Sequence, residues 1–370
     1  MRDFSSVKRI VIKIGTNLIS TKNGVNKERI KEIVEQVAKL KEEGLQILIV
    51  SSGAVGLGAK ALNHKNEVKY IALKQACASI GQPELMAAWA KEFKKYNLLC
   101  SQILITRSVL NNRKSYNNLR TTVMTLLELG VIPIFNENDV ISTSEINNVF
   151  GDNDRMSAYV ASKIDASLLL LLTDIDGLYT DNPKTNKEAK LITELDEVDS
   201  TVLSWARGKG STFSTGGMKT KLLASQIAQK GGCGTIIASG EEENVILKIM
   251  RGEERGTYIR PLSRISQRER WIINTPSSGS ITVDSGAEKA LIIGHKSLLP
   301  SGIVKIDGVF KEGDVVSILS PNGEVIMKAI SSFNSSELLL IKGHSSSEIN
   351  AMIGEKHKVV FRPEDAAINE

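Results

Sequence analysis

Two lysines stand beside glycine-containing segments in patterns that could hold phosphate groups. Lys13 lies at the end of an apolar run and is followed by Gly15 and Thr16, whose amide and hydroxyl can donate to an anion. Lys221 follows a Thr-Gly-Gly segment, residues 215–217, that opens a helical pattern where amides, helix dipole and lysine charge would converge. Taken alone, the first pattern is more often a surface lysine before a turn, whereas the second favours a nucleotide-phosphate site.

Two clusters of carboxylates and amides could recognise an amino acid. Residues 136–139 read Asn-Glu-Asn-Asp, and residues 152–154 read Asp-Asn-Asp. An ammonium group is well matched by carboxylate and amide oxygens, although a simple helix cap would also explain residues 152–154. The small residues 51–58 could hold an anionic ligand against backbone amides, or could serve only close helix–strand packing. Neither a Walker A loop nor a dinucleotide G-x-G-x-x-G pattern occurs in the chain.

An alternation of strands and helices must position these segments. Short runs rich in Ile, Val and Leu are typical of strands buried on both faces. The alternation predicts an α/β fold with a doubly wound, mostly parallel sheet, whose ligands bind beyond the carboxyl ends of the strands. The predicted strands are residues 9–14, 46–51, 101–106, 132–136, 168–173 and 235–238, and the predicted helices are residues 27–43, 68–96, 113–128, 154–163 and 218–230.

The pattern changes after about residue 250. Residues 255–270 are basic and show no clear period, and from residue 279 short strands alternate with Gly, Pro, Ser and Asn. Such spacing predicts a small all-β barrel-like domain, with strands near residues 279–284, 302–306, 315–319 and 325–330. We therefore predict domains at residues 1–254 and 279–362, joined by a basic linker at residues 255–278.

Composition narrows the class of protein. The 370 residues suffice for two domains, and 41% apolar residues is ordinary for a globular protein. No apolar run approaches the ~20 residues of a membrane helix, and charges interrupt the first apolar run, so we predict neither a membrane span nor an export signal. The three cysteines, Cys77, Cys100 and Cys233, lack metal-ligand spacing and suit the reducing cytoplasm.

Charge is spread unevenly along the chain. Residues 276–370 hold 9 Lys and Arg against 12 Asp and Glu, a net charge of −3, which leaves +8 on the remainder. The only aromatic residues of this region are Phe310, Phe333 and Phe361. Because nucleic-acid binding rests on basic surfaces and stacking aromatics, we predict that nucleic acid is not a partner.

The motifs, in this order, resemble the amino acid kinase family over about residues 8–250. They are Lys-x-Gly-Thr, Ser-Gly-Ala, Asn-Glu-Asn-Asp, Gly-Asp-Asn-Asp-x-x-Ser-Ala, Thr-Asp-x-x-Gly-Leu-Tyr-Thr and Thr-Gly-Gly-Met-x-Thr-Lys. The third and fourth are most specific to the glutamate 5-kinases, and residues 279–357 resemble the PUA domain that many of these enzymes carry. Asn17, Met156 and Asn182 depart from the usual pattern, but none of them removes a charge that the reaction needs.

The resemblance implies ATP-dependent phosphorylation of the side-chain carboxylate of L-glutamate, the first step of proline biosynthesis. Lys13 and Lys221 would flank the transferring group, with Asp154 orienting both, and Mg²⁺ would be held mainly through the ATP phosphates. Glutamate would contact Ser52, Gly53, Ala54, Asp139, Asp152 and Asn153. ATP would contact Lys13, Gly15, Thr16, Thr173, Asp174, Thr215, Gly216, Gly217, Met218, Lys219, Thr220 and Lys221.

The resemblance also implies partners. Proline would act as a feedback inhibitor, with residues 140–150, including Glu145, as a gate. We further expect a homo-oligomer and association with the next-step glutamyl phosphate reductase. Two alternatives stay open: a sister kinase that acts on acetylglutamate, aspartate, uridylate or carbamate, and an RNA-binding PUA protein.

Overall fold

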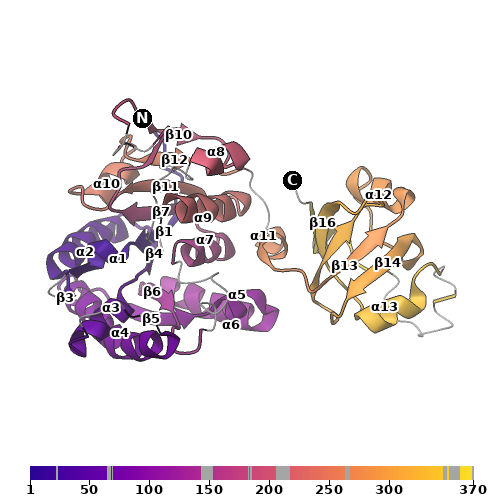
Figure 1. Cartoon of the computed structure of the whole chain (residues 1–370), viewed down its shortest axis with the longest axis horizontal. Coiled ribbons are helices and arrows are strands. Elements are labelled where there is room, and N and C mark those ends of the chain that lie inside the picture. Colours follow the sequence, from indigo (N-terminus) through magenta and orange to yellow (C-terminus); the bar gives the residue numbers. More distant parts are fainter. Residues whose placement is uncertain are drawn as a thin grey trace. The chain divides into compact units, whose positions relative to one another are not determined.

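The chain folds into two compact units, Met1–Arg264 and Ile265–Glu370 (Figure 1). The computed structural model describes residues 1–21, 24–64, 68, 70–142, 153–181, 183, 186–205, 217–262, 267–344, 348–349 and 359–368. Within these residues, no helix is long and apolar enough to cross a membrane.

The first unit is built on one eight-stranded sheet. Its strands are β1 (Arg9–Ile14), β4 (Gln46–Val50), β5 (Cys100–Ile105), β6 (Ile132–Glu137), β7 (Leu168–Thr173), β10 (Glu194–Leu195), β11 (Gly234–Ser239) and β12 (Thr257–Ile259). The strand order is β10-β12-β11-β7-β1-β4-β6-β5, and the pairs from β11 to β5 are parallel. Because β1 is central and the chain winds outward from it in both directions, the predicted doubly wound, mostly parallel sheet is confirmed.

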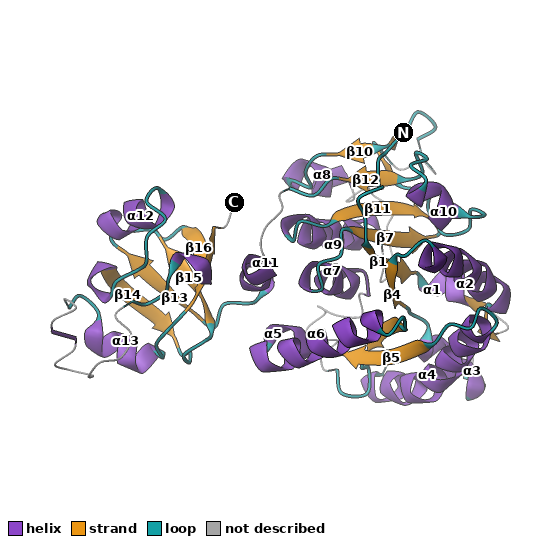
Figure 2. Cartoon of the chain, turned by 180° about the vertical axis from the view of Figure 1, so that it is seen from behind, coloured by secondary structure: helices purple, strands orange, loops and turns teal. Residues whose placement is uncertain are grey.

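Helices cover both faces of this sheet (Figure 2). Successive strand side chains point to opposite faces, so Ile10 and Ile12 pack into one core cluster and Val11 packs into another. The first cluster includes α2 (Lys27–Glu42), α3 (Ala54–Ala61), α4 (Ile71–Lys94) and α10 (Val245–Met250). The second includes α6 (Arg113–Glu128), α7 (Asn153–Lys163) and α9 (Met218–Lys230).

Helices α3 and α4 cross with their backbones in contact. A Cβ on Gly58 would lie 1.7 Å from the carbonyl oxygen of Cys77, and a Cβ on Gly81 would lie 2.0 Å from that of Ala54. Both glycines are therefore required by packing, and α4 is held against the first turn of α3. The sequence patterns predicted α4 but not the short helix α3.

Smaller elements complete the first unit. They are α1 (Thr16–Ile19), α5 (Arg107–Asn111), α8 (Ser200–Trp205), and the strand pairs β2 (Ser20–Thr21) with β3 (Gly24–Val25) and β8 (Leu178–Tyr179) with β9 (Leu191–Ile192). Strand β12 lies within the range predicted as a linker, yet it pairs with β11 in the main sheet.

The second unit is a small β domain with short helices. Its five strands, in the order β14-β13-β15-β16-β17, pair antiparallel except for β13 with β15. They are β13 (Gly279–Val283), β14 (Ile303–Gly308), β15 (Val315–Leu319), β16 (Val325–Ile330) and β17 (Ala366–Ile368). The remaining elements are α11 (Gln267–Asn274), α12 (Ser285–Ile292), α13 (Ser335–Ile341), η2 (Pro300–Gly302) and η3 (Pro363–Asp365). The predicted β domain is confirmed, with helices that the sequence patterns did not predict.

Candidate functional site

The carboxyl edge of the sheet gathers the predicted functional segments. Lys13, near the end of β1, is paired in register with Val50 of β4 and Leu171 of β7. Ser52, just after β4, and Thr173, the last residue of β7, therefore lie at the same edge as Lys13. Parallel pairing thus brings together three segments that are far apart in the sequence.

A buried carboxylate joins the two predicted catalytic lysines. Asp154, in the first turn of α7, places Oδ1 2.5 Å from the Lys13 ammonium and Oδ2 3.3 Å from the Lys221 ammonium. The side chain of Asp154 is 1% exposed, and those of the two lysines are 9% and 4% exposed. All three predicted catalytic residues therefore meet in one largely dehydrated cluster, where charge interactions are strong.

The environment keeps Asp154 ionised. Burial by itself would raise its pKa, but the charges of Lys13 and Lys221 and a hydrogen bond from the Thr220 hydroxyl lower the pKa below its ordinary value. The Thr220 hydroxyl also donates to the carbonyl of Gly217, which precedes α9. The first turns of α7 and α9 thus converge on the Asp154 carboxylate. Because helix N-termini and lysines both carry positive charge, this region is suited to binding an anionic ligand.

The predicted ATP-binding residues that precede the 215–221 segment lie at the ends of β1 and β7. The backbone amide of Gly15 donates a hydrogen bond to the carbonyl oxygen of Leu172. A Cβ on Gly15 would lie 3.3 Å from the same oxygen. The Asp174 carboxylate accepts hydrogen bonds from Thr173 and from Asn17, the residue that departs from the family pattern. Although burial would raise its pKa, these hydrogen bonds and the charge of Lys221 lower the pKa of Asp174.

Two of the predicted ATP contacts, Thr215 and Gly216, lie outside the described residues, and so does the predicted glutamate contact Asp152. On the described side of the loop, Met218 and Lys219 begin α9, and Lys219 is exposed. Thr16 begins α1 directly after Gly15.

The predicted glutamate-binding residues form a second polar group beside the lysines. The Asn153 amide nitrogen lies 2.8 Å from the Ser52 hydroxyl, 3.0 Å from the Ser51 carbonyl and 3.1 Å from the Asn136 side-chain oxygen. Gly53 has a φ of 105°, a left-handed conformation that glycine adopts at little cost, and it leads directly into Ala54 at the start of α3. The carboxyl ends of β4 and β6 therefore meet the first residue of α7.

Asp139 lies slightly farther along the same edge. It lines a cavity of about 250 Å³ together with Gln82, Gln102, Glu137 and other residues. Glu137 accepts a hydrogen bond of 2.6 Å from the Ser142 hydroxyl. The cavity thus presents two carboxylates, which suit an ammonium group, and Gln82 in its lining is hydrogen-bonded to Asn136 of the group around Asn153.

Sequence reasoning missed several residues of this site. Asn136 belongs to the Asn-Glu-Asn-Asp motif, which could have identified it, but only Asp139 of that motif was assigned a role. Gln82 lies in the middle of α4, and Trp89, whose indole nitrogen donates to the Ser51 hydroxyl, lies two turns farther along on nearly the same face of the helix. Nothing in the local sequence marks these two helical residues as neighbours of the site.

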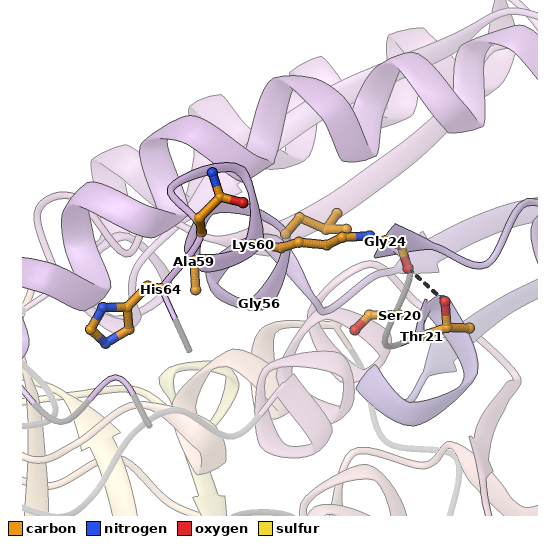
Figure 3. Close-up of a pocket in the computed structure, with 9 residues that line it drawn as sticks. Ser20, Thr21, Gly24, Gly56, Ala59, Lys60 and His64 are labelled. Atoms are coloured by element: carbon orange, nitrogen blue, oxygen red, sulfur yellow. Dashed lines mark hydrogen bonds between the residues drawn. The ribbon is translucent and has the colours of Figure 1, made fainter. Parts of the chain in front are cut away.

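A separate cavity of about 360 Å³ lies between the β2–β3 hairpin and α3. Figure 3 shows Lys60 extending from α3 toward Gly24, with His64 in the segment that follows the end of this helix. The lining of this cavity includes none of the residues predicted to bind ATP or glutamate.

Comparison with known proteins identifies the families to which the two parts of the chain are related. The sequence model of the amino acid kinase family matches residues 8–239, and that of the PUA domain matches residues 279–353. The chain belongs to the amino acid kinase family. The predicted resemblance to this family, and that of the C-terminal region to the PUA domain, are confirmed.

Relatives within the amino acid kinase family cover nearly the whole chain. Glutamate 5-kinase of Methanosarcina mazei is 42% identical over 99% of this chain and 97% of its own length. Glutamate 5-kinase of Methanococcoides burtonii is 44% identical over 95% of this chain and 93% of its own. Among solved structures, UMP kinase from Bacillus anthracis gives a TM-score of 0.48 at 19% identity, covering 70% of this chain and 97% of its own.

Proposed function

We propose that the chain is an ATP-dependent kinase that phosphorylates the side-chain carboxylate of L-glutamate to γ-glutamyl phosphate, the first step of proline biosynthesis. The observation that carries this proposal is the Asp154 carboxylate held between Lys13 and Lys221, with Asn153 turned toward Ser52 beside it. Full-length relatives with the name glutamate 5-kinase support the same acceptor.

The chemistry follows from the charges of the site. The acceptor carboxylate is already ionised and nucleophilic, so the reaction needs no general base. The chain must instead bring two anions together and neutralise the charge on the moving phosphoryl group. Lys13 and Lys221 supply compact positive charges, and Asp154 fixes their ammonium groups before the substrates bind.

Mg²⁺ fits this site chiefly through ATP. The ion is commonly held by substrate phosphates together with one or two carboxylates, and when bound it neutralises phosphate charge. Asp174 is an exposed carboxylate at the ATP edge, held in place by Thr173 and Asn17. The chain's own contribution is therefore to orient the nucleotide with amides and lysines.

Acceptor choice tests the proposal. We expect coupled ADP release with L-glutamate and little with N-acetylglutamate, aspartate or UMP, and trapping with hydroxylamine should yield the γ-hydroxamate. Robust turnover of N-acetylglutamate without turnover of glutamate would refute the assignment and favour a sister kinase.

Regulation and partners follow as parts of the proposal. Proline retains the α-amino and carboxylate groups of glutamate, so it would compete in the pocket beside Asp139 and Asn153. Of the predicted gate at residues 140–150, residues 143–150, which include Glu145, lie outside the described residues. We also propose a homo-oligomer and a functional link to glutamyl phosphate reductase, which consumes the labile product.

The C-terminal unit would not bind nucleic acid, because residues 276–370, which form most of it, carry a net charge of −3 and few aromatics. A cytoplasmic location is supported by three cysteines that form no disulfide, two of which are buried.

A further inference from the structure

A chain of side-chain amides runs from the surface of the first unit into the proposed glutamate pocket. The Gln82 amide nitrogen donates to the Gln102 side-chain oxygen at 3.1 Å, and the Gln82 oxygen accepts from the Asn136 amide nitrogen at 2.8 Å. The Asn136 oxygen in turn accepts from Asn153 at 3.1 Å, and Asn153 lies 2.8 Å from the Ser52 hydroxyl.

The direction of each amide depends on its neighbour. The Asn136 oxygen faces two donors, the Asn153 side chain and the Glu137 amide. This orientation leaves the Asn136 amide nitrogen facing Gln82, which must therefore present its oxygen. If the Asn136 side chain were rotated by 180°, its NH₂ group would face the NH₂ group of Asn153. Two donors would then lie opposite each other, and the buried amide would lose a hydrogen-bond partner.

Packing holds Gln82 where this contact is made. The neighbouring Gly81 rests on the backbone of α3, where a Cβ would lie 2.0 Å from the Ala54 carbonyl oxygen. Ala54 begins α3 and is itself a predicted glutamate contact. The same turn of α4 therefore contacts two parts of the pocket. Gly81 contacts its backbone, and Gln82, which is only 9% exposed, contacts its side chains.

We propose that Gln82 is a positioning residue for the acceptor substrate: it orients Asn136, which in turn orients Asn153 and Ser52. This inference rests on the proposed function. Gln82 does not contact the lysine cluster, and its chain of hydrogen bonds ends on the acceptor side rather than at Thr173 or Asp174. Loss of Gln82 should therefore weaken the use of glutamate without an equal effect on ATP.

The test compares Gln82→Met with Gln36→Met in the full chain. Gln36 is a matched control because it is 3% exposed and makes two hydrogen bonds, to the Glu32 carbonyl and from the Ile246 amide, remote from the pocket. Both variants should lower the thermal midpoint. Only Gln82→Met should raise the KM for glutamate, by ~10-fold, the scale of one lost buried hydrogen bond, with kcat and the KM for ATP changed less than ~3-fold.

A double-mutant cycle distinguishes positioning from direct contact. In an Asn136→Ala background, adding Gln82→Met should change the KM for glutamate by less than ~2-fold, because the residue through which Gln82 acts is already lost. Independent, multiplying effects would overturn the proposal, and so would a Gln82→Met variant that matches Gln36→Met. If the wild-type chain released no ADP with glutamate, both the proposed function and this inference would fail. If the wild type is active, the difference between the two variants reports on Gln82 alone.

Discussion

Replacing Asp154 by Asn removes one charge from the centre of the site and keeps nearly the same shape. The two ammonium groups of Lys13 and Lys221 then face each other across a neutral amide in a region that is almost closed to water. We expect this substitution to impair both folding stability and catalysis, because a buried charge cluster becomes uncompensated.

The magnitude follows from the distances. Two opposite charges about 4 Å apart attract by roughly 4 kcal/mol at the effective dielectric of a protein, and Asp154 has two such contacts at 2.5 and 3.3 Å. Desolvation of the buried groups offsets much of this attraction, and loss of one partner from a buried pair typically costs about 3–5 kcal/mol. Transition-state stabilisation should fall as well, lowering kcat/KM for glutamate by ~10²-fold or more.

Urea unfolding at pH 7 measures the stability term, with Asp165→Asn as the control. Asp165 pairs with Arg120 at 2.7 Å but is 33% exposed, so the same chemical change there should cost less than about 1 kcal/mol.

The pKa of Asp154 is lowered by folding. The contribution of Asp154 to the free energy of unfolding is therefore fully present above its unfolded pKa and is lost as pH falls through the folded pKa.

The stability gap between wild type and Asp154→Asn should therefore be constant near neutrality and narrow below about pH 4. Equal losses in the two variants at pH 7, or a gap that persists unchanged into strong acid, would show that the lysine–carboxylate cluster does not stabilise the fold as argued.

Four further outcomes are expected. Asp139→Ala should raise the KM for glutamate more than it lowers kcat in steady-state assays, because the residue binds ground and transition states alike. Arg2→Met should lower the free energy of unfolding in urea by about 2–4 kcal/mol, since the buried guanidinium donates to the carbonyls of Thr193 and Gly256. A chain ending at residue 264 should retain ADP release with glutamate, because the lysine–carboxylate cluster lies wholly in the first unit; a folded but inactive truncation would contradict this. Proline should raise the glutamate concentration for half-maximal rate, and substitution of Glu145 should weaken that effect; inhibition insensitive to glutamate would indicate a separate proline site.

Local pattern was sufficient to predict most elements and the residue types of the site. The apolar run at residues 168–173 coincides with β7, and the helical pattern at residues 218–230 coincides with α9. Both agree because a strand buried on two faces has a continuous apolar run and a helix has a period of 3.6 residues, so each signal lies within its own segment. Lys13, Asp154 and Lys221 were recognisable from motifs at strand and helix ends. The two lysines already indicate anion binding by their residue type, whereas the orienting role of Asp154 was implied only by the family resemblance.

Contacts across the sequence were decided only by the tertiary structure. Asp154 and Lys221 are 67 positions apart, and Gln82 and Asn136 are 54 positions apart, so neither pair leaves a local pattern. The amide chain depends on how closely α4 approaches α3, and that approach is set by the absence of a Cβ at Gly58 and Gly81. A glycine in a sequence shows that close contact is allowed, but only the folded chain determines which backbone makes it.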